Sequence, residues 1–580
     1  MKRLLSLLLA VCLLCACTAL AENDLYDLFP LDGEPITLNV YSQLANYSGI
    51  QTGWSAQLLL DRFNVKVNII PDQDGVYETR VASGNLGDIV VWGANGDDYK
   101  NAVNQGLLLD WEEDDLGEIY APYIWENYQS ALQSNRTISG DDTIHGFGFN
   151  IALSDGESTG EQARQSFFYT CDIRWDLYKQ LGYPEINTLD DLIEVFKQMK
   201  EICPTDEKGN ETYAASIWPD WDGNMVMYVK ALATAYYGYD ELGFGLYNPT
   251  NGEFYSCLDE DGPYMECLKF FNKLYRENLL DPASMTQKYD NMSEKVKNGG
   301  AFWGIFNYAS SMAYNTEEHL SAGKMMYACV PNEASPIVYG MSDVGGSRIW
   351  SIGADTEYPE LCLAILDYLA TPEGSMTMWY GPKGLTWDYD ENGGHYFTEL
   401  GKKTSSDSKY DLTGVEWTSN FSGKTYVLSG NFNDGCLQIN NTTLTNDMVD
   451  PDSAAGEAFN KDTWASELTA ASYEIYQDWR DYTGCMTSDQ YMSGHNYLVM
   501  PDIPYSESAK DAELSVIWSQ VAKTIVNYSW RAIYAKNDGE FNYHISEMRK
   551  MCNQYGFDKC LEWCNQEAAI KWQLTQDLNK

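Results

Sequence analysis

An alternation of strand and helix patterns begins at residue 36, and it limits the fold more than any other feature of the chain. Residues 36–41 (ITLNVY) and 65–70 (VKVNII) have the length and β-branched content of strands, and residues 54–63 between them have the apolar spacing of an amphipathic helix. Strand, helix and strand of these lengths predict a βαβ unit with a parallel sheet. Residues 87–92 predict a third strand, so the expected fold class is α/β.

The ends of these strands predict a binding edge. In open parallel sheets, ligands bind at the carboxyl ends of the strands. Tyr41, Ser42, Trp92 and Asn95 follow or end predicted strands. We therefore expect these side chains at the carboxyl edge of the predicted sheet.

The rest of the chain is dominated by helical patterns. A chain of 580 residues is too long for a single core, so two large lobes are expected. Thr188 is a predicted helix N-cap, with Asp191 at the third position of the helix. The predicted helices cover residues 172–181, 188–202, 265–278 and 359–369, and most of the tail at 511–578.

The first 21 residues have the features of a secretory signal. Lys2 and Arg3 precede a short apolar run over 4–14 and then small residues. The run is too short to span a bilayer, and no later stretch approaches the roughly 20 apolar residues of a spanning helix. We therefore predict export, with residues 22–35 as a tether.

Two processing sites remain open. Lipidation at Cys17 would hold the protein at the outer face of the cytoplasmic membrane, that is, at the cell surface. Cleavage after Ala21 is the alternative.

The charge of the chain excludes one class of partner. The formal net charge is −47, and it falls to −49 once the signal, with its two positive charges, is removed. Such a field repels phosphate backbones, so no nucleic acid partner is expected. Without residues 1–21 we expect a soluble monomer.

The cysteines do not indicate a disulfide framework. Three of the fourteen lie in the signal, and the remaining eleven cannot all pair. Cys552, Cys560 and Cys564 have neither a C-x-x-C pair nor a matching histidine spacing, which favours small buried side chains over a metal or redox site.

Two short motifs resemble catalytic or nucleotide-binding loops but lack the required context. Residues 156–160 (GESTG) match G-x-S-x-G, yet no buried strand leads into them, so we predict a loop and no catalytic residue. Residues 423–425 (GKT) lack the first glycine of a phosphate loop, because Thr418 stands there.

A third motif matches the spacing of a calcium loop. Asp388, Asp390, Asn392 and Glu399 fit the pattern. The flanks at 385–387 and 395–397 look like strands, however, and favour a hairpin turn at Asn392-Gly393. We therefore expect no cofactor. The alternative is a calcium ion bound at this motif.

Tryptophans beside Gly, Pro, Asp or Asn are the positive functional signal. Aromatic faces beside polar groups suit sugars, whose C–H faces pack on rings. A single tryptophan is more often a core residue, but several at loop-like positions favour a carbohydrate site. They are Trp92, Trp218, Trp221, Trp303, Trp350 and Trp387.

Several segments, in order along the chain, resemble family 1 extracellular solute-binding proteins, which include the maltodextrin-binding type. The resemblance covers residues 81–92 with 106–110, 169–192, 298–308 and 364–384, and the ending at 530–572 is similar to the longer lipoprotein subgroup. It implies a two-lobe, periplasmic-binding-protein-like (type II) fold with hinge crossovers. The implied boundaries are lobe 1 at 36–152, lobe 2 at 153–335, a return to lobe 1 at 336–358, and mainly lobe 2 at 359–580.

The resemblance also implies site residues. Trp92 falls on a sugar-stacking position, with Asn95 and Asp97 nearby as ligands of sugar hydroxyls, and Tyr308 falls on a second stacking position. Trp218 lies near a third. Some relatives have a calcium loop near 206–210, where the acids of this chain are incomplete. All candidate ligand contacts are Tyr41, Trp92, Asn95, Asp97, Trp218, Trp221, Asp222, Trp303, Tyr308, Arg348 and Trp350.

The implied function is capture of a carbohydrate, such as an oligosaccharide, between the lobes. The closed protein would then deliver it to the membrane permease of an ABC importer, whose ATPase is a separate chain. No catalysis is needed. A secreted glycan-degrading enzyme with two carboxylates is the alternative, and an adhesive surface module is a third class.

Overall fold

The computed structural model describes residues 25, 33–45, 47–73, 75–148, 151, 164–167, 169–341, 343–346, 348–407, 409–432, 449–469 and 473–578. The predicted signal, Cys17 and the 156–160 loop lie outside these residues. The chain divides into two compact units. Unit 1 comprises Met1–Leu153, Asp343–Trp387 and Lys409–Thr443, and unit 2 comprises Ser154–Ser342, Asp388–Ser408 and Leu444–Lys580.

The βαβ prediction for unit 1 is confirmed. Strands β1 (Ile36–Ser42) and β3 (Val65–Pro71) pair in parallel, and helix α2 (Gly53–Phe63) connects them. Strand β4 (Ile89–Trp92) pairs in parallel with the other side of β1. The full sheet has the order β2-β3-β1-β4-β13-β5, with β2 at Gly49–Ile50, β5 at Gly146–Gly148 and β13 at Ile349–Ile352.

Short helices cover the sheet of unit 1. They are α3 (Val76–Ser83), α4 (Asp97–Asn104), η2 (Glu113–Asp115), α5 (Leu116–Tyr120), α6 (Pro122–Asn127), α7 (Gln129–Ser139), α15 (Pro359–Ala370) and α16 (Pro372–Tyr380). A hairpin of β16 (Glu416–Thr418) and β17 (Thr425–Val427) also belongs to unit 1.

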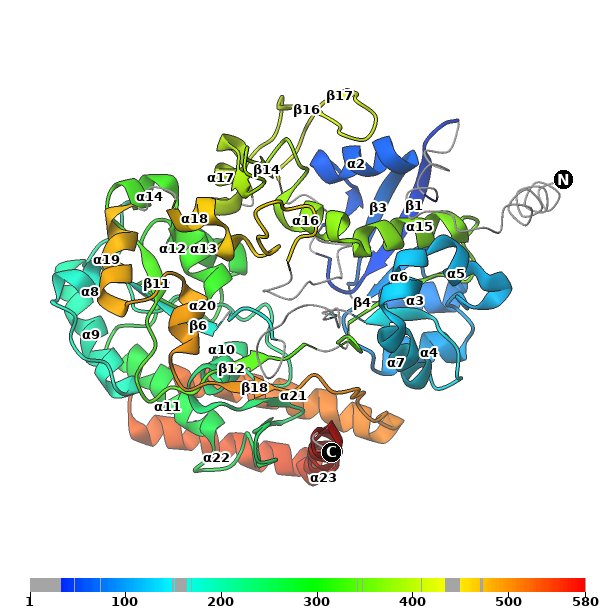
Figure 1. The fold of residues 1–580 in the computed structure, drawn as a ribbon. Coiled ribbons are helices and arrows are strands. Elements are labelled where there is room, and N and C mark those ends of the chain that lie inside the picture. The colour runs from blue at the N-terminus through cyan, green and yellow to red at the C-terminus, as the bar shows by residue number, and fades with distance from the viewer. Residues whose placement is uncertain are drawn as a thin grey trace. The chain divides into compact units, whose positions relative to one another are not determined.

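The extent of unit 1 differs from the expected lobe boundaries. Residues 359–387 and 409–443, expected mainly in the second lobe, belong to unit 1. Helix α15 lies against α5 and α6 (Figure 1), where Asp367 accepts a hydrogen bond from the Ile124 N–H at 2.9 Å. Residues 361–370 are all buried. A helix that is apolar on all sides must be covered on all sides, and the sheet and helices of unit 1 provide that cover.

Unit 2 is built around a three-stranded antiparallel sheet. Strand β6 (Tyr169–Arg174) lies between β10 (Trp303–Phe306) and β11 (Met326–Ala328). The helix predicted from residue 172 therefore begins only at Trp175 (α8, Trp175–Gln180), because Asp172 and Ile173 pair with both β10 and β11. The predicted cap of α9 (Leu189–Ile202) is confirmed, since Thr188 Oγ1 accepts from the Asp191 N–H at 3.2 Å and Asp191 accepts from the Thr188 N–H at 2.9 Å.

Helices form most of the rest of unit 2. They are α10 (Met227–Leu232), η3 (Ala233–Tyr237), α11 (Pro263–Arg276), α12 (Tyr289–Lys297), η4 (Asn307–Ala309), α13 (Ser311–Tyr314), α14 (Glu317–Ser321), α17 (Glu399–Ser406), η6 (Lys461–Thr463), α18 (Ala465–Thr469), α19 (Glu474–Thr483) and α20 (Ser488–Ser493). The helical tail is confirmed as α21 (Ala512–Ile533), α22 (Asp538–Tyr555) and α23 (Phe557–Leu578), orange to red in Figure 1.

Small sheets complete the fold. They are β7 (Asp240–Leu242) with β8 (Gly245–Tyr247) and β9 (Phe254–Ser256), β12 (Ile337–Tyr339) with β18 (Leu498–Met500), and β14 (Trp387–Tyr389) with β15 (His395–Phe397).

The described part of the chain contains no helix long and apolar enough to cross a membrane. Its ten cysteines are all free thiols, and Cys552, Cys560 and Cys564 are buried as expected. Burial raises the pKa of these three thiols, which disfavours the reactive thiolate.

Candidate functional site

Three partly exposed rings form a cluster on unit 2, which we call the aromatic platform: Trp221, Tyr289 and Tyr308. Trp221 is 42% exposed, a high value for so large an apolar side chain. Its ring stacks on Tyr289 at 4.9 Å and 28° and lies 6.3 Å from Tyr308. Exposed stacked rings present the flat apolar faces that pack on the C–H faces of sugars.

The platform rests on buried rings of unit 2. Trp218 is 0% exposed and contacts Trp221 and Tyr289 edge to face, each at 5.1 Å. Tyr308 follows the carboxyl end of β10 and stacks on Phe306 at 5.1 Å. Trp218 therefore supports the platform from below, and its ring has no exposed face for a ligand.

Hydrogen bonds fix the loop that carries Trp221. Asp222 accepts from the Met227 N–H at 2.8 Å and from Trp530 Nε1 at 2.6 Å, so its carboxylate is committed to the protein. Burial raises the pKa of Asp222 to about 6, although both hydrogen bonds act to lower it. Asp220 accepts from the Tyr289 N–H at 3.1 Å and so ties the two stacked rings together. Asp222 is a positioning residue for Trp221.

Burial raises the pKa of Tyr308 as well. Like other tyrosine hydroxyls it is protonated at neutral pH, and it can donate a hydrogen bond. The platform thus combines two stacked apolar rings with a polar group at its edge.

The expectation of an exposed ring at Trp92 is wrong. Trp92 is 0% exposed and packs edge to face against Tyr41, Tyr77 and Tyr99, at 6.4, 6.3 and 5.7 Å. Its indole donates to Ser351 Oγ at 3.1 Å. All these partners belong to unit 1, so Trp92 is a core residue there and we withdraw it as a stacking contact.

Trp303 and Trp350 are also core residues. They lie in β10 and β13, and their exposed fractions are 2% and 0%. Their neighbouring glycine and polar residues suggested loops. The neighbour of Trp303 is Gly304, and a Cβ added at Gly304 would lie only 2.7 Å from the Cβ of Ser310. This glycine therefore reflects close packing inside a strand.

The remaining candidates are divided between buried and exposed positions in unit 1. Asn95 is 4% exposed, whereas Asp97, in the first turn of α4, and Arg348 are exposed. Their roles in ligand binding remain predictions.

Sequence reasoning missed polar residues at the carboxyl edge of the unit 1 sheet. Gln43 donates to Asp98 Oδ2 at 2.9 Å and accepts from the Gly93 N–H at 2.9 Å. Tyr77 donates to the Asp98 carbonyl at 2.7 Å. Position alone could have indicated Gln43, because it follows the first strand directly.

The motif at 388–399 forms a hairpin, as its flanks predicted. Asp390 Oδ1 accepts from the N–H groups of Asn392 and Gly394, at 2.7 and 2.9 Å, and closes the turn between β14 and β15. Glu399 lies in the first turn of α17 and pairs with Lys402 at 2.9 Å. The described residues contain no group of three or more His, Cys, Asp or Glu side chains that could hold a metal.

The 206–210 loop has protein cations beside its acids. Glu207 lies 3.0 Å from His319 Nε2 and 2.6 Å from Lys324 Nζ. Burial acts to raise the pKa of Glu207, but these two partners hold it below its ordinary value.

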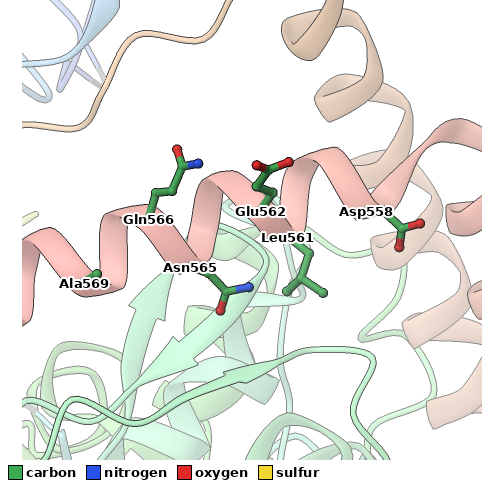
Figure 2. A pocket seen from close by; sticks show the side chains of 6 residues that line it. All are labelled: Asp558, Leu561, Glu562, Asn565, Gln566 and Ala569. Atoms are coloured by element: carbon green, nitrogen blue, oxygen red, sulfur yellow. The ribbon is translucent and has the colours of Figure 1, made fainter.

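A shallow hollow of about 500 Å³ lies elsewhere on unit 2. Figure 2 shows that its lining side chains all come from helix α23. The lining contains no aromatic ring, so we place the candidate site at the aromatic platform. The residues of the hollow are Asp558, Leu561, Glu562, Asn565, Gln566 and Ala569.

The two compact α/β units define a protein of the two-lobe α/β class. The chain belongs to the bacterial extracellular solute-binding protein family, whose profile matches residues 47–376. The resemblance found in the sequence is therefore confirmed, and so is the two-lobe α/β fold class.

A curated relative is lipoprotein LipO of Bacillus subtilis (strain 168). It is 23% identical over 353 residues, which are 59% of this chain and 64% of LipO. The match thus spans less than two thirds of the length of that lipoprotein.

Solved structures share the fold over almost the whole chain. Alginate-binding protein AlgQ2 is 15% identical, with a TM-score of 0.56, over 93% of this chain and 99% of its own. The substrate-binding protein FusA of S. pneumoniae, solved with kestose, is 16% identical, with a TM-score of 0.54, over 94% and 100%. An HMO-binding protein from Bifidobacterium longum infantis is 13% identical, with a TM-score of 0.51, over 93% and 99%. At these identities the likeness shows the fold alone.

Proposed function

We propose that this chain captures a carbohydrate outside the cytoplasm and delivers it to the permease of an ABC importer whose ATPase is a separate chain. The single observation that carries the proposal is the exposed stack of Trp221 on Tyr289 in a member of a solute-binding family. The Trp221 ring packs on Trp218 on one side and remains open to solvent on another, and an open aromatic face suits the apolar face of a sugar ring.

The printed descriptions of the structural relatives support a carbohydrate. FusA was solved with kestose, AlgQ2 is an alginate-binding protein, and a third relative binds HMO. These ligands differ in sugar and charge, so they support the class of ligand without identifying the sugar.

A binding experiment with matched variants tests the proposal. We expect calorimetric titration against a panel of neutral, anionic and amino oligosaccharides to find at least one that binds. Trp221→Ala should then weaken that sugar by about 1–3 kcal/mol, as truncation of an interface aromatic does. The control is Tyr482→Ala, which removes another exposed ring of unit 2 (52% exposed) that stacks on Tyr183 at 4.5 Å.

The results separate binding at the platform from a general effect. Unchanged affinity in Trp221→Ala, or an equal loss in Tyr482→Ala, would contradict the platform as the site. If no sugar of the panel binds the wild type, the carbohydrate proposal itself fails.

The same samples distinguish a binding protein from a glycan-degrading enzyme. We expect mass spectrometry to recover every sugar intact after prolonged incubation. Shortened oligosaccharides would favour the enzyme.

We further propose that Cys17 is lipidated and that the protein acts as a monomer at the outer face of the cytoplasmic membrane. The family is extracellular, and a relative is named a lipoprotein. Cys17→Ala should release the protein from the membrane fraction while export continues. An unchanged distribution would instead favour cleavage after Ala21, and a dimer of the released form by light scattering would contradict the monomer.

A further inference from the structure

A buried carboxylate lies next to the segment that carries Tyr308 of the aromatic platform. Asp172 is 1% exposed on β6, the central strand of the unit 2 sheet, where it pairs with Gly304 and Ala328. The described part of the chain gives Asp172 no ion-pair partner. Taking a lone carboxylate out of water is costly, so this acid needs either strong hydrogen-bond donors or a proton of its own.

The hydroxyl of Ser310 contacts two oxygen atoms at once. Its Oγ lies 2.7 Å from Asp172 Oδ2 and 2.6 Å from the carbonyl oxygen of Phe306. A serine hydroxyl has a single proton. If Asp172 were ionised, both neighbouring oxygens would be acceptors, and that proton could satisfy only one of them.

A proton on Asp172 satisfies both contacts. The carboxylic acid then donates to Ser310 Oγ, and the Ser310 hydroxyl donates to the Phe306 carbonyl. The Ser311 N–H lies 3.1 Å from the same carboxyl oxygen, which can still accept when it is protonated. Burial acts in the same direction because it raises the pKa of Asp172, although hydrogen bonds from Ser310 and Ser311 act to lower it.

The titratable groups that face Asp172 in the described residues are neutral. They are the thiol of Cys171 on the same strand, the thiol of Cys329 just after β11, and the hydroxyl of Tyr476 on α19. Burial raises the pKa of all three groups, so none is charged at neutral pH. A neutral acid fits these surroundings, because a buried charge would have no opposite charge beside it.

The hydrogen bonds from Asp172 close the turn that carries Tyr308. Phe306 ends β10, Tyr308 lies in η4, and Ser310 follows η4, so the bond between Ser310 and Phe306 spans this turn. The Tyr308 ring stacks on Phe306 at 5.1 Å and lies 6.3 Å from Trp221. The place of Tyr308 on the platform therefore depends on bonds that begin at Asp172.

We propose that Asp172 holds a proton in the folded protein and positions Tyr308 for ligand binding through Ser310 and the Phe306 carbonyl. Asp172 is buried, so it is a positioning residue that acts through Ser310 and not by contact with a sugar. The inference rests on the proposed carbohydrate function and adds a residue behind the binding surface.

Infrared difference spectroscopy tests the proton directly. At about pH 8, where Asp222 with its lower pKa is ionised, wild type minus Asp172→Asn should show the C=O stretch of a protonated carboxylic acid. Ser310→Ala removes the group that receives the proton, so the same band should shift in frequency. A difference spectrum with only the bands of an ionised carboxylate would overturn the inference.

Sugar titration tests the positioning role. The probes are kestose, an oligouronate and a glucosamine oligosaccharide, and the variants are compared with any of the three that binds wild type. Asp172→Asn should bind within about threefold of wild type, because its amide can donate to Ser310 as the acid does. Asp172→Leu, of similar shape but apolar, and Ser310→Ala should each weaken binding at least about tenfold.

The matched control is Glu562→Gln, which makes the same change from acid to amide at an exposed position of α23. It should alter neither the infrared band nor the affinity. Melting curves identify any variant that does not fold, and the remaining variants then decide the result.

The outcomes separate this inference from the proposed function. If Asp172→Asn folds but loses affinity as Ser310→Ala does, or if Asp172→Leu and Ser310→Ala bind as wild type, the inference is overturned while sugar binding stands. If neither these probes nor any sugar of the wider panel binds wild type, the proposed function fails, and the infrared spectra alone decide whether Asp172 holds its proton.

Discussion

Trp92 and Ser351 are joined by a hydrogen bond of 3.1 Å from the indole Nε1 to the serine Oγ, which links the antiparallel strands β4 and β13. The two residues are 259 positions apart, and they lie on neighbouring interior strands of the unit 1 sheet. The bond holds a segment that returns to unit 1 late in the chain.

We therefore expect Trp92→Ala to be a stability variant. Truncating a buried tryptophan should lower the free energy of unfolding by about 3–5 kcal/mol, because it leaves a cavity among three tyrosines. Chemical denaturation measures the loss, and titration of the folded variant should show sugar affinity within about threefold of wild type. A stable Trp92→Ala that has lost its sugar would restore the stacking role.

Asp222 predicts a pH dependence of stability. Its folded pKa of about 6 lies above the ordinary value of 3.8, so the folded state holds the proton more tightly than the unfolded chain. The stabilisation from this proton is present below about pH 4 and is lost as pH rises through 6. We expect a contribution on the order of 1–3 kcal/mol.

Asp222→Asn tests this contribution through the slope of stability with pH. Denaturation from pH 4 to pH 7 should show a shallower decline in the variant, whatever its absolute stability. Parallel curves for wild type and variant would contradict the assignment. Glu562→Gln, which removes an exposed charge on α23, serves as the control for charge alone.

His395 is held between two carboxylates in unit 2. Its Nε2 lies 2.7 Å from Asp450 and its Nδ1 lies 3.0 Å from Glu457, and its ring stacks on Trp464 at 4.8 Å. His395→Ala would leave two largely buried acids without their shared partner, so we expect a loss of about 3–5 kcal/mol in unfolding free energy. Lys402→Gln, which breaks the exposed pair with Glu399, should cost less than about 1 kcal/mol.

The pH profile of His395→Ala provides a further check. Burial acts to raise the pKa of Asp450, but hydrogen bonds from His395 and Tyr389 hold it below its ordinary value. The stability that this carboxylate contributes is thus present above about pH 4 and is lost as pH falls. We expect the wild type to lose stability on acidification more steeply than the variant, and the opposite order would contradict the role of the pair.

Calcium should have little effect on folding. At 206–210 the acid Glu207 is paired with His319 and Lys324, and at 388–399 Asp390 is occupied by backbone N–H groups. We therefore expect the same melting temperature, within about 1 °C, in millimolar calcium and in chelator. A bound calcium ion would raise the melting temperature, because a ligand that binds only the folded state stabilises that state. A clear rise with calcium but not with magnesium would favour a calcium site.

Much of the fold could be predicted from local patterns. The βαβ unit at 36–71, the capping box of Thr188 and Asp191, and the helical tail all follow from apolar spacing and capping chemistry within a few residues. The start of α8 could not, because residues 172–174 have a helical pattern but pair with two strands that lie far away in the sequence.

The candidate site was less predictable. Trp218 and Trp221 are three positions apart in similar surroundings of Pro, Asp and Gly, yet one is 0% and the other 42% exposed. Tyr289, which completes the stack, carries no motif that connects it with Trp221. Its place is set by the chain path through α12 and by the bond from its N–H to Asp220.

The sequence by itself determined the α/β class, the family and the local elements, because spacing, caps and turn residues act over a few positions. Only the tertiary structure decided which tryptophans are core and which form the platform, and which acids are paired. Exposure and pairing depend on segments hundreds of residues apart, such as β4 with β13, and a local pattern contains no information about what will cover it.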